Sequence, residues 1–183
     1  MKKNPLIATL KFSFIFAALV MFNTSMAQNT SKEKKLVRDC SESKEEFIET
    51  DGLMKSLFAN AYGYAIFPNV GKGGIGIGGA VGNGIVYEGG SIIGKAKLTQ
   101  LSIGFQFGGQ AYREVIFFES SADLDRFKEN KIEFSAQASA VAVTAGASAN
   151  VKYKEGVMIF TQQKGGLMYE ASIGGQKFNY ISF

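Results

Sequence analysis

The sequence predicts an α+β fold: N-terminal amphipathic helices packed on a strongly curved, glycine-rich, mainly antiparallel β-sheet or barrel-like domain, with one short inserted helix. Between residues 31 and 62 the apolar side chains recur at helical spacing among charged ones. After Gly63 the period changes to two, which is the period of a strand. Most of the 22 glycines follow that point, and glycines within strands indicate bends, bulges and close strand crossings.

The first 27 residues have the pattern of a secretory signal peptide. Lys2 and Lys3 precede an apolar run over residues 12–22, and Ser25, Met26 and Ala27 form a small-x-small cleavage site. A membrane-spanning helix needs about 20 apolar residues, so this run is too short to be one. We therefore expect an exported protein, periplasmic or secreted, with residues 28–183 forming a single mature domain.

The composition narrows the chemistry that is available. The chain has no histidine and one cysteine, Cys40, which excludes Ser-His-Asp and Cys-His nucleophile systems, histidine metal sites and an internal disulfide. We expect no enzyme activity, no cofactor and no metal. Three of the 20 basic residues lie in the leader, so 17 remain against 16 acidic residues, and this balance argues against a nucleic-acid partner.

Two helices are expected in the N-terminal part, residues 28–62. Over residues 31–50, Leu36, Cys40 and Phe47 share one helical stripe, which gives Cys40 a core position rather than a reactive one. Residues 50–52 (Thr-Asp-Gly) indicate a break. A shorter amphipathic helix then extends from Leu53 to about Tyr62.

Strands are expected over most of residues 63–183. Residues 64–67 read as a strand ended by Pro68, and residues 73–81 and 85–87 read as a hairpin turned by Gly82-Asn83-Gly84. Residues 101–107 alternate as a further strand. The strand over residues 112–118 is apolar on both faces at its end, which is typical of a central position.

The C-terminal part contains one short helix and several further strands. The helix is expected over residues 123–130, begun by Ser120 or Ser121. Residues 134–149 allow either helix or strand, and β-branched Val141 and Val143 favour strand. Residues 156–162 and 167–173 are expected to form a final hairpin, and residues 178–183 an edge strand.

Two glycine-rich motifs imitate nucleotide-binding loops. Residues 71–76 satisfy G-x-G-x-x-G, but the glycines that follow are unsuited to the helix that a dinucleotide site requires. Residues 89–95 have P-loop spacing, with Ala96 where serine or threonine would bind Mg²⁺. We expect structural roles for both.

Several segments, in order and spacing, resemble the SYLF lipid-binding domain family. They are residues 58–68 (FANAYGYAIFP), 70–74 (VGKGG), 82–84 (GNG), 103–110 (IGFQFGGQ) and 164–167 (KGGL). The resemblance extends over about residues 47–173. It implies a non-catalytic module that binds anionic phospholipid or a membrane surface, with phosphoinositide binding in eukaryotic members and actin binding in some fungal ones.

The same resemblance suggests where lipid would bind. Eukaryotic members use a basic N-terminal amphipathic helix, and the loosely corresponding residues here are Lys32, Lys34, Lys35 and Arg38 beside Leu36 and Val37. A solvated helix end would have the same pattern. Lys72 and Lys164 are secondary candidates, because flanking glycines would let a phosphate approach backbone N–H groups. The alternative function is an envelope structural protein that binds another protein or self-associates through its β surface.

Export should yield a mature chain that begins at Gln28, because Ala27 completes the small-x-small site after the apolar run. Intact-mass analysis of the exported protein is expected to give the mass of residues 28–183. An exported chain that keeps residues 1–27 would contradict the signal-peptide prediction.

Overall fold

The computed structural model describes residues 30–75, 77–103, 110–132, 134, 139–164 and 170–183. The predicted signal peptide lies outside these residues. The chain divides into two units, Met1–Val37 and Arg38–Phe183. A helix over residues 30–50 crosses this boundary, and every other described element belongs to the second unit.

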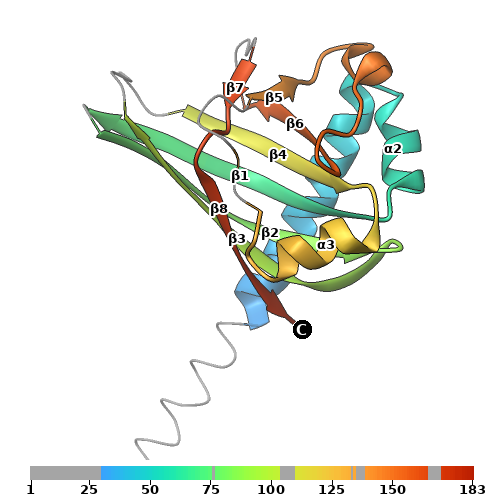
Figure 1. Cartoon of the computed structure of the whole chain (residues 1–183), viewed down its shortest axis with the longest axis horizontal. Coiled ribbons are helices and arrows are strands. Elements are labelled where there is room, and N and C mark those ends of the chain that lie inside the picture. The colour runs from blue at the N-terminus through green and yellow to red at the C-terminus, as the bar shows by residue number, and fades with distance from the viewer. Residues whose placement is uncertain (1–29, 76, 104–109, 133, 135–138, 165–169) are drawn as a thin grey trace, which may run out of the picture. The chain divides into compact units, whose positions relative to one another are not determined.

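The second unit is built on an eight-stranded mixed sheet (Figure 1). Its strand order is β7-β5-β6-β4-β1-β2-β3-β8. The elements after the first helix are α2 (Met54–Asn60), β1 (Gly63–Ile75), β2 (Ile77–Glu88), β3 (Ser91–Ile103), β4 (Gln110–Phe118), α3 (Ser121–Lys128), β5 (Ser139–Ala142), η1 (Ala147–Asn150), β6 (Val157–Gln163), β7 (Glu170–Ser172) and β8 (Gln176–Ser182). Only β5 and β6 pair in parallel among the described strands. The predicted α+β class is confirmed. The sheet is open, so the barrel-like alternative is wrong.

Pro68 does not end its strand, contrary to the prediction. β1 continues to Ile75, and its register shifts between Ile66 and Asn69 against β2 and between Phe67 and Val70 against β4. Proline has no N–H to donate to the ladder, and a bulge is a place where a strand tolerates that loss.

The predicted turn at Gly82-Asn83-Gly84 is also wrong. These residues lie inside β2, where Gly82 pairs with Val70 and Gly84 with Ala96. A methyl group at Gly84 would collide with the carbonyl oxygen of Ile66. The glycine is therefore required for the close approach of β1 and β2 rather than for a turn.

The C-terminal strands pair differently from the predicted final hairpin. β5 lies between β6 and β7, so β6 and β7 are not neighbours. In the ambiguous segment, residues 139–142 form a strand and residues 147–150 a 3₁₀-helix. The central position of β4, the helix after Ser120 and the edge strand near the C-terminus are confirmed.

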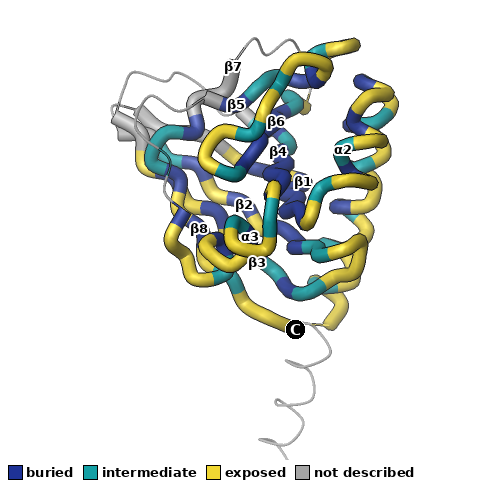
Figure 2. Tube along the Cα trace, turned by 45° about the vertical axis from the view of Figure 1, so that its right-hand side comes forward, coloured by how far each residue is buried: buried dark blue, intermediate teal, exposed yellow. Residues whose placement is uncertain are grey.

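The helix segment after Arg38 and α2 cover one face of the central strands. Cys40 and Phe47 from the first helix are fully buried there, and the Cys40 thiol donates to the carbonyl oxygen of Ile66 at 3.3 Å. The Phe58 ring of α2 packs edge-on against Phe117 with centroids 4.9 Å apart. Buried residues accordingly concentrate in the central strands (Figure 2).

The opposite face of the sheet holds the larger apolar core. Leu124 and Phe127 of α3 are fully buried against it, and the ring of Phe127 lies 5.0 Å from those of Phe118 and Phe178. Because Phe118 belongs to β4 and Phe178 to the edge strand β8, α3 ties the centre of the sheet to its edge.

A buried carboxylate links the end of the first helix to the C-terminal part of the chain. Asp51 is 2% exposed, and its Oδ2 accepts hydrogen bonds from the backbone N–H of Ser148 at 2.9 Å and from its hydroxyl at 2.7 Å. The N–H of Leu53 donates to Oδ1 at 3.1 Å. Burial raises the pKa of Asp51, but these hydrogen bonds outweigh it and leave the pKa below its ordinary value.

A second buried carboxyl, Glu114 of β4, lies in the core on the α3 side. It is fully buried, and Gln176 Nε2 donates to its Oε2 at 3.0 Å. The same amide lies 3.4 Å from the hydroxyl of Tyr112. Glu114 Oε1 has no hydrogen-bond partner among the described residues. Burial therefore raises the pKa of Glu114 to about 7, although the hydrogen bond from Gln176 opposes the shift.

Removing the Asp51 carboxylate should leave the buried Ser148 N–H without its acceptor. We expect Asp51→Ala to lower the free energy of unfolding by about 2–3 kcal/mol, measured by urea denaturation. Glu45→Ala, on the exposed side of the helix over residues 30–50, is the control. It should change the free energy of unfolding by less than about 0.5 kcal/mol. Equal effects of the two substitutions would contradict the role given to Asp51.

Glu114 should make the protein less stable as the pH rises. Because its pKa is higher in the folded state, folding takes up a proton, and stability should fall by up to about 3 kcal/mol from about pH 4.5 to about pH 7. In Glu114→Gln this loss should disappear, since the amide stays neutral and still accepts from Gln176. Urea unfolding at pH 5 and pH 8 measures the difference, with exposed Glu119→Gln as control. The same pH dependence in Glu114→Gln and the unaltered protein would refute the assignment.

Candidate functional site

The four predicted cationic contacts all lie on the helix over residues 30–50, at exposed positions: Lys32, Lys34, Lys35 and Arg38. The Arg38 side chain is 65% exposed and forms ion pairs of 3.5 Å with both Asp39 and Glu42. Exposed ion pairs of this kind are weak, so they leave the charge of Arg38 open to a competing anion. The helix thus presents a cluster of cations to solvent within three turns.

The two apolar residues predicted beside these cations, Leu36 and Val37, lie at different angles around the helix. At 100° per residue, Leu36 lies close to the line of Cys40 and Phe47, whereas Lys34 and Arg38 lie roughly opposite. Val37 lies about 60° from Lys34, on the same side of the helix. The stripe that contains Leu36 is the one buried against the sheet at Cys40 and Phe47. The side of the helix that carries Lys34 and Arg38 therefore presents mainly charge, with Val37 as its apolar neighbour.

Charge is distributed unevenly along this helix. Residues 30–38 contain the four cations and only one acid, Glu33, whereas residues 39–50 contain five acids and one cation, Lys44. Carboxylates near a helix C-terminus oppose the helix dipole, so this order does not stabilise the helix itself. The cationic cluster therefore needs another explanation than helix stability.

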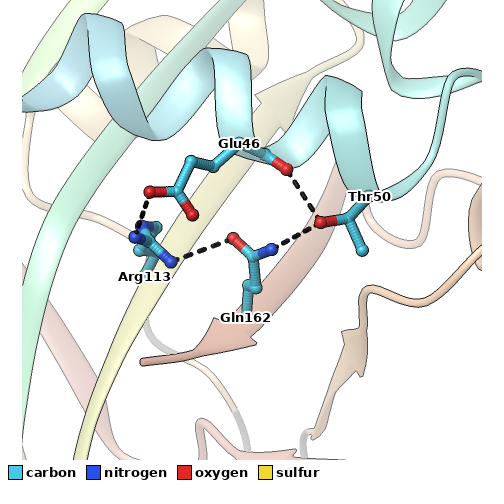
Figure 3. A network of polar contacts seen from close by, with 4 residues as sticks. All are labelled: Glu46, Thr50, Arg113 and Gln162. Atoms are coloured by element: carbon cyan, nitrogen blue, oxygen red, sulfur yellow. Dashed lines mark hydrogen bonds and ion pairs between the residues drawn. The ribbon is translucent and has the colours of Figure 1, made fainter. Parts of the chain in front are cut away.

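A ring of polar contacts fixes the helix to the sheet (Figure 3). Arg113 of β4 pairs with Glu46 at 2.7 Å and donates to Gln162 of β6 at 3.2 Å. Gln162 Nε2 donates to the Thr50 hydroxyl at 2.7 Å, and that hydroxyl donates to the carbonyl oxygen of Glu46 at 2.9 Å. The Arg113 side chain is only 14% exposed, so this guanidinium serves the fold rather than a ligand.

Lys44 is likewise held inside the helix–sheet contact. Its Nζ donates to the Tyr64 hydroxyl at 3.1 Å and lies 5.0 Å from the Phe58 ring centroid. Cation–π contacts of this geometry stabilise a partly buried ammonium group. Lys44 is therefore not part of the cationic surface of residues 30–38.

The two secondary candidates, Lys72 and Lys164, lie at the same end of the sheet. Lys72 of β1 pairs with Gln110 of β4, and the backbone N–H of Lys164 donates to the carbonyl oxygen of Ala111 at 3.0 Å. The two backbones therefore flank the start of β4. Lys164 is exposed, whereas the side chain of Lys72 and the neighbouring residues 165–169 lie outside the described parts. A phosphate site at this end stays a prediction.

The described part of the chain gives little support to a dinucleotide loop, a reactive thiol or a metal site. Residues 71–75 belong to β1 and lead into β2 rather than into a helix, so the G-x-G-x-x-G match is not a dinucleotide loop. Burial raises the pKa of the Cys40 thiol to about 12, which keeps it protonated, as its predicted core position implies. The described residues contain no group of three metal-ligating side chains and no helix both long and apolar enough to span a bilayer.

Sequence reasoning missed the polar residues of β4. Tyr112, Glu114 and Ile116 alternate onto one face, while Arg113 alternates onto the other with Val115 and Phe117. The period of two could have placed Glu114 in the core with Ile116. Nothing local could have paired Arg113 with Gln162, which is 49 residues away.

Two comparisons with known proteins agree with the motif resemblance. Residues 99–180 match the family model Ysc84, described as "Las17-binding protein actin regulator". The chain is also 31% identical over 127 residues to Beta cell expansion factor A of Aeromonas veronii. That alignment covers 68% of this chain and 48% of the relative, so the chain spans about half of the relative's length. The family match extends from β3 into β8, and the chain belongs to the Ysc84 (SYLF) domain family.

Proposed function

We propose that this chain is a non-catalytic, exported protein that binds anionic phospholipid or a membrane surface, in the periplasm or outside the cell. The observation that carries the proposal is the exposed cationic cluster of Lys32, Lys34, Lys35 and Arg38 on one helix. Each such cation contributes about 1 kcal/mol at an anionic membrane surface.

The attraction would be local rather than global. The predicted mature chain has 17 basic and 16 acidic residues, so its net charge gives almost no long-range pull toward an anionic surface. Concentrating four cations near one end of a helix gives that end a positive field within the screening distance of about 8 Å. The end of the helix rich in carboxylates would stay away from the membrane.

Non-catalytic action is supported by the chemistry that the residues offer. The sequence has no histidine, and the buried Cys40 thiol stays protonated. Glu114 has a raised pKa, as catalytic carboxyls often do, but it is fully buried among core residues. Because no substrate can reach the Glu114 carboxyl, its raised pKa affects the stability of the fold rather than catalysis.

The alternative is an envelope protein that binds another protein or self-associates. The matched family model is described by its binding of a protein, Las17, and by actin regulation, which favours a protein partner for members of that family. Salt separates the two functions only partly, because charged protein interfaces are also screened. Binding to protein-free vesicles separates them directly.

The cationic cluster should control binding to anionic vesicles. Reversing all four charges (Lys32→Glu, Lys34→Glu, Lys35→Glu, Arg38→Glu) is expected to weaken co-sedimentation with phosphatidylglycerol-containing vesicles by about 100-fold or more at low salt. The loss should shrink as salt rises, and binding to neutral phosphatidylcholine vesicles should change little.

A matched variant isolates position from net charge. Reversal of four other exposed lysines, Lys55, Lys131, Lys152 and Lys154, changes the net charge equally and should cost much less affinity. A correctly folded helix variant that binds like the unaltered protein would show that the cluster is not the contact. No binding of the unaltered chain to any vesicle would overturn the proposed function and favour the protein-binding alternative.

A further inference from the structure

The helix segment after Arg38 and α2 cover only part of the sheet face on which they pack. On β2 and β3 that face carries Ile85 opposite Lys95, then Asn83 opposite Lys97, then Val81 opposite Thr99. Ile85 is fully buried, but Val81, four residues before it on the same strand and face, is 51% exposed. The helices therefore stop covering this face between Ile85 and Val81.

The edge strand β8 continues this uncovered face. Lys177 pairs with Thr99, and Ile181 pairs with Lys95, so their side chains point to the same side. The other side of β3 and β8 is the core, where Leu98 and Phe178 are buried. The exposed side is therefore one continuous surface across β2, β3 and β8.

This surface carries large aliphatic side chains that folding leaves in water. Leu101 is 81% exposed, Val81 lies diagonally across from it, and Ile181 is 52% exposed. Isolated exposed aliphatics are common, whereas several on one sheet face mark an interaction surface. The terminal Phe183, 60% exposed, adds an aromatic ring 5.8 Å from the Lys95 ammonium group.

The charge of the surface has one sign. Its charged positions on β2, β3 and β8 are Lys95, Lys97 and Lys177, and these three strands contribute no acid to this face. Lysines set among aliphatic side chains suit a partner that is anionic at its surface and apolar beneath. A bilayer containing anionic lipid has that layered chemistry, because lysine amines reach the headgroups while aliphatic side chains enter the interface.

We infer that the uncovered face of β2, β3 and β8 is a membrane-contact surface, with Leu101, Val81 and Ile181 entering the interface and Lys97 and Lys177 meeting anionic headgroups. The inference rests on the proposed function and adds to it a second contact. This face carries exposed aliphatic side chains together with its lysines.

The chain contains no tryptophan, so a single introduced tryptophan reports on its own surroundings. Leu101→Trp places the reporter on the proposed surface, at a side chain exposed enough to tolerate exchange. Leu53→Trp, 48% exposed at the start of α2, is the control. Val81→Trp is a second reporter should the first variant not fold. Each is mixed with anionic vesicles that contain brominated phosphatidylcholine, which quenches tryptophan within the bilayer.

We expect the emission of Leu101→Trp to shift to the blue and to be quenched, and that of Leu53→Trp to change little. Reversal of Lys97 and Lys177 to Glu should weaken vesicle binding about 30-fold, and reversal of Lys131 and Lys152 by much less. Vesicle binding without quenching at Leu101 or Val81 would overturn this inference and leave the proposed function intact. Absence of co-sedimentation by the unaltered chain would overturn both.

Discussion

The architecture depends on one constraint, which is that the central strands are apolar on both faces. In β4, Val115, Ile116, Phe117 and Phe118 are all fully buried although their side chains alternate between the two sides of the sheet. Both sides must therefore be covered. The helix segment after Arg38 and α2 supply one cover, and α3 with the inner side of β8 supplies the other. The extent of the helix segment after Arg38 and of α2 then determines which sheet surface stays open.

The two buried carboxyls show that burial alone does not determine a pKa. Both side chains have little contact with solvent, and Glu114 is enclosed more deeply than Asp51. Asp51 accepts hydrogen bonds from the backbone N–H groups of Leu53 and Ser148 and from the Ser148 hydroxyl, and its pKa is lowered. Glu114 accepts one from a side-chain amide, and its pKa is raised to about 7. The hydrogen-bond donors around Asp51 therefore keep its carboxylate ionised and its contact with Ser148 stable at neutral pH. Glu114 has fewer donors, so its ionisation destabilises the core.

Local patterns predicted the elements well and their pairing poorly. The stripe of Cys40 and Phe47 correctly indicated a helix against the sheet, because burial there follows the helical period. Pro68 and Gly84 were misread because a bulge and a close strand crossing depend on the neighbouring strand. The insertion of β5 beside β6 is likewise a long-range pairing without a local signal. For the site, exposure of the basic helix residues followed from the sequence, whereas the uncovered lysines and aliphatics required the register of three strands.

We propose that anionic membranes meet the chain on the uncovered face of β2, β3 and β8. Hydroxyl-radical footprinting of the unaltered protein, free and bound to anionic vesicles, tests this without any substitution. Exposed apolar side chains on two parts of the surface serve as internal probes. Bound vesicles are expected to protect Val81, Leu101 and Ile181 while Leu53 and Tyr62 react as in the free protein. Protection of Leu53 and Tyr62 with continued reaction at Leu101 would contradict it.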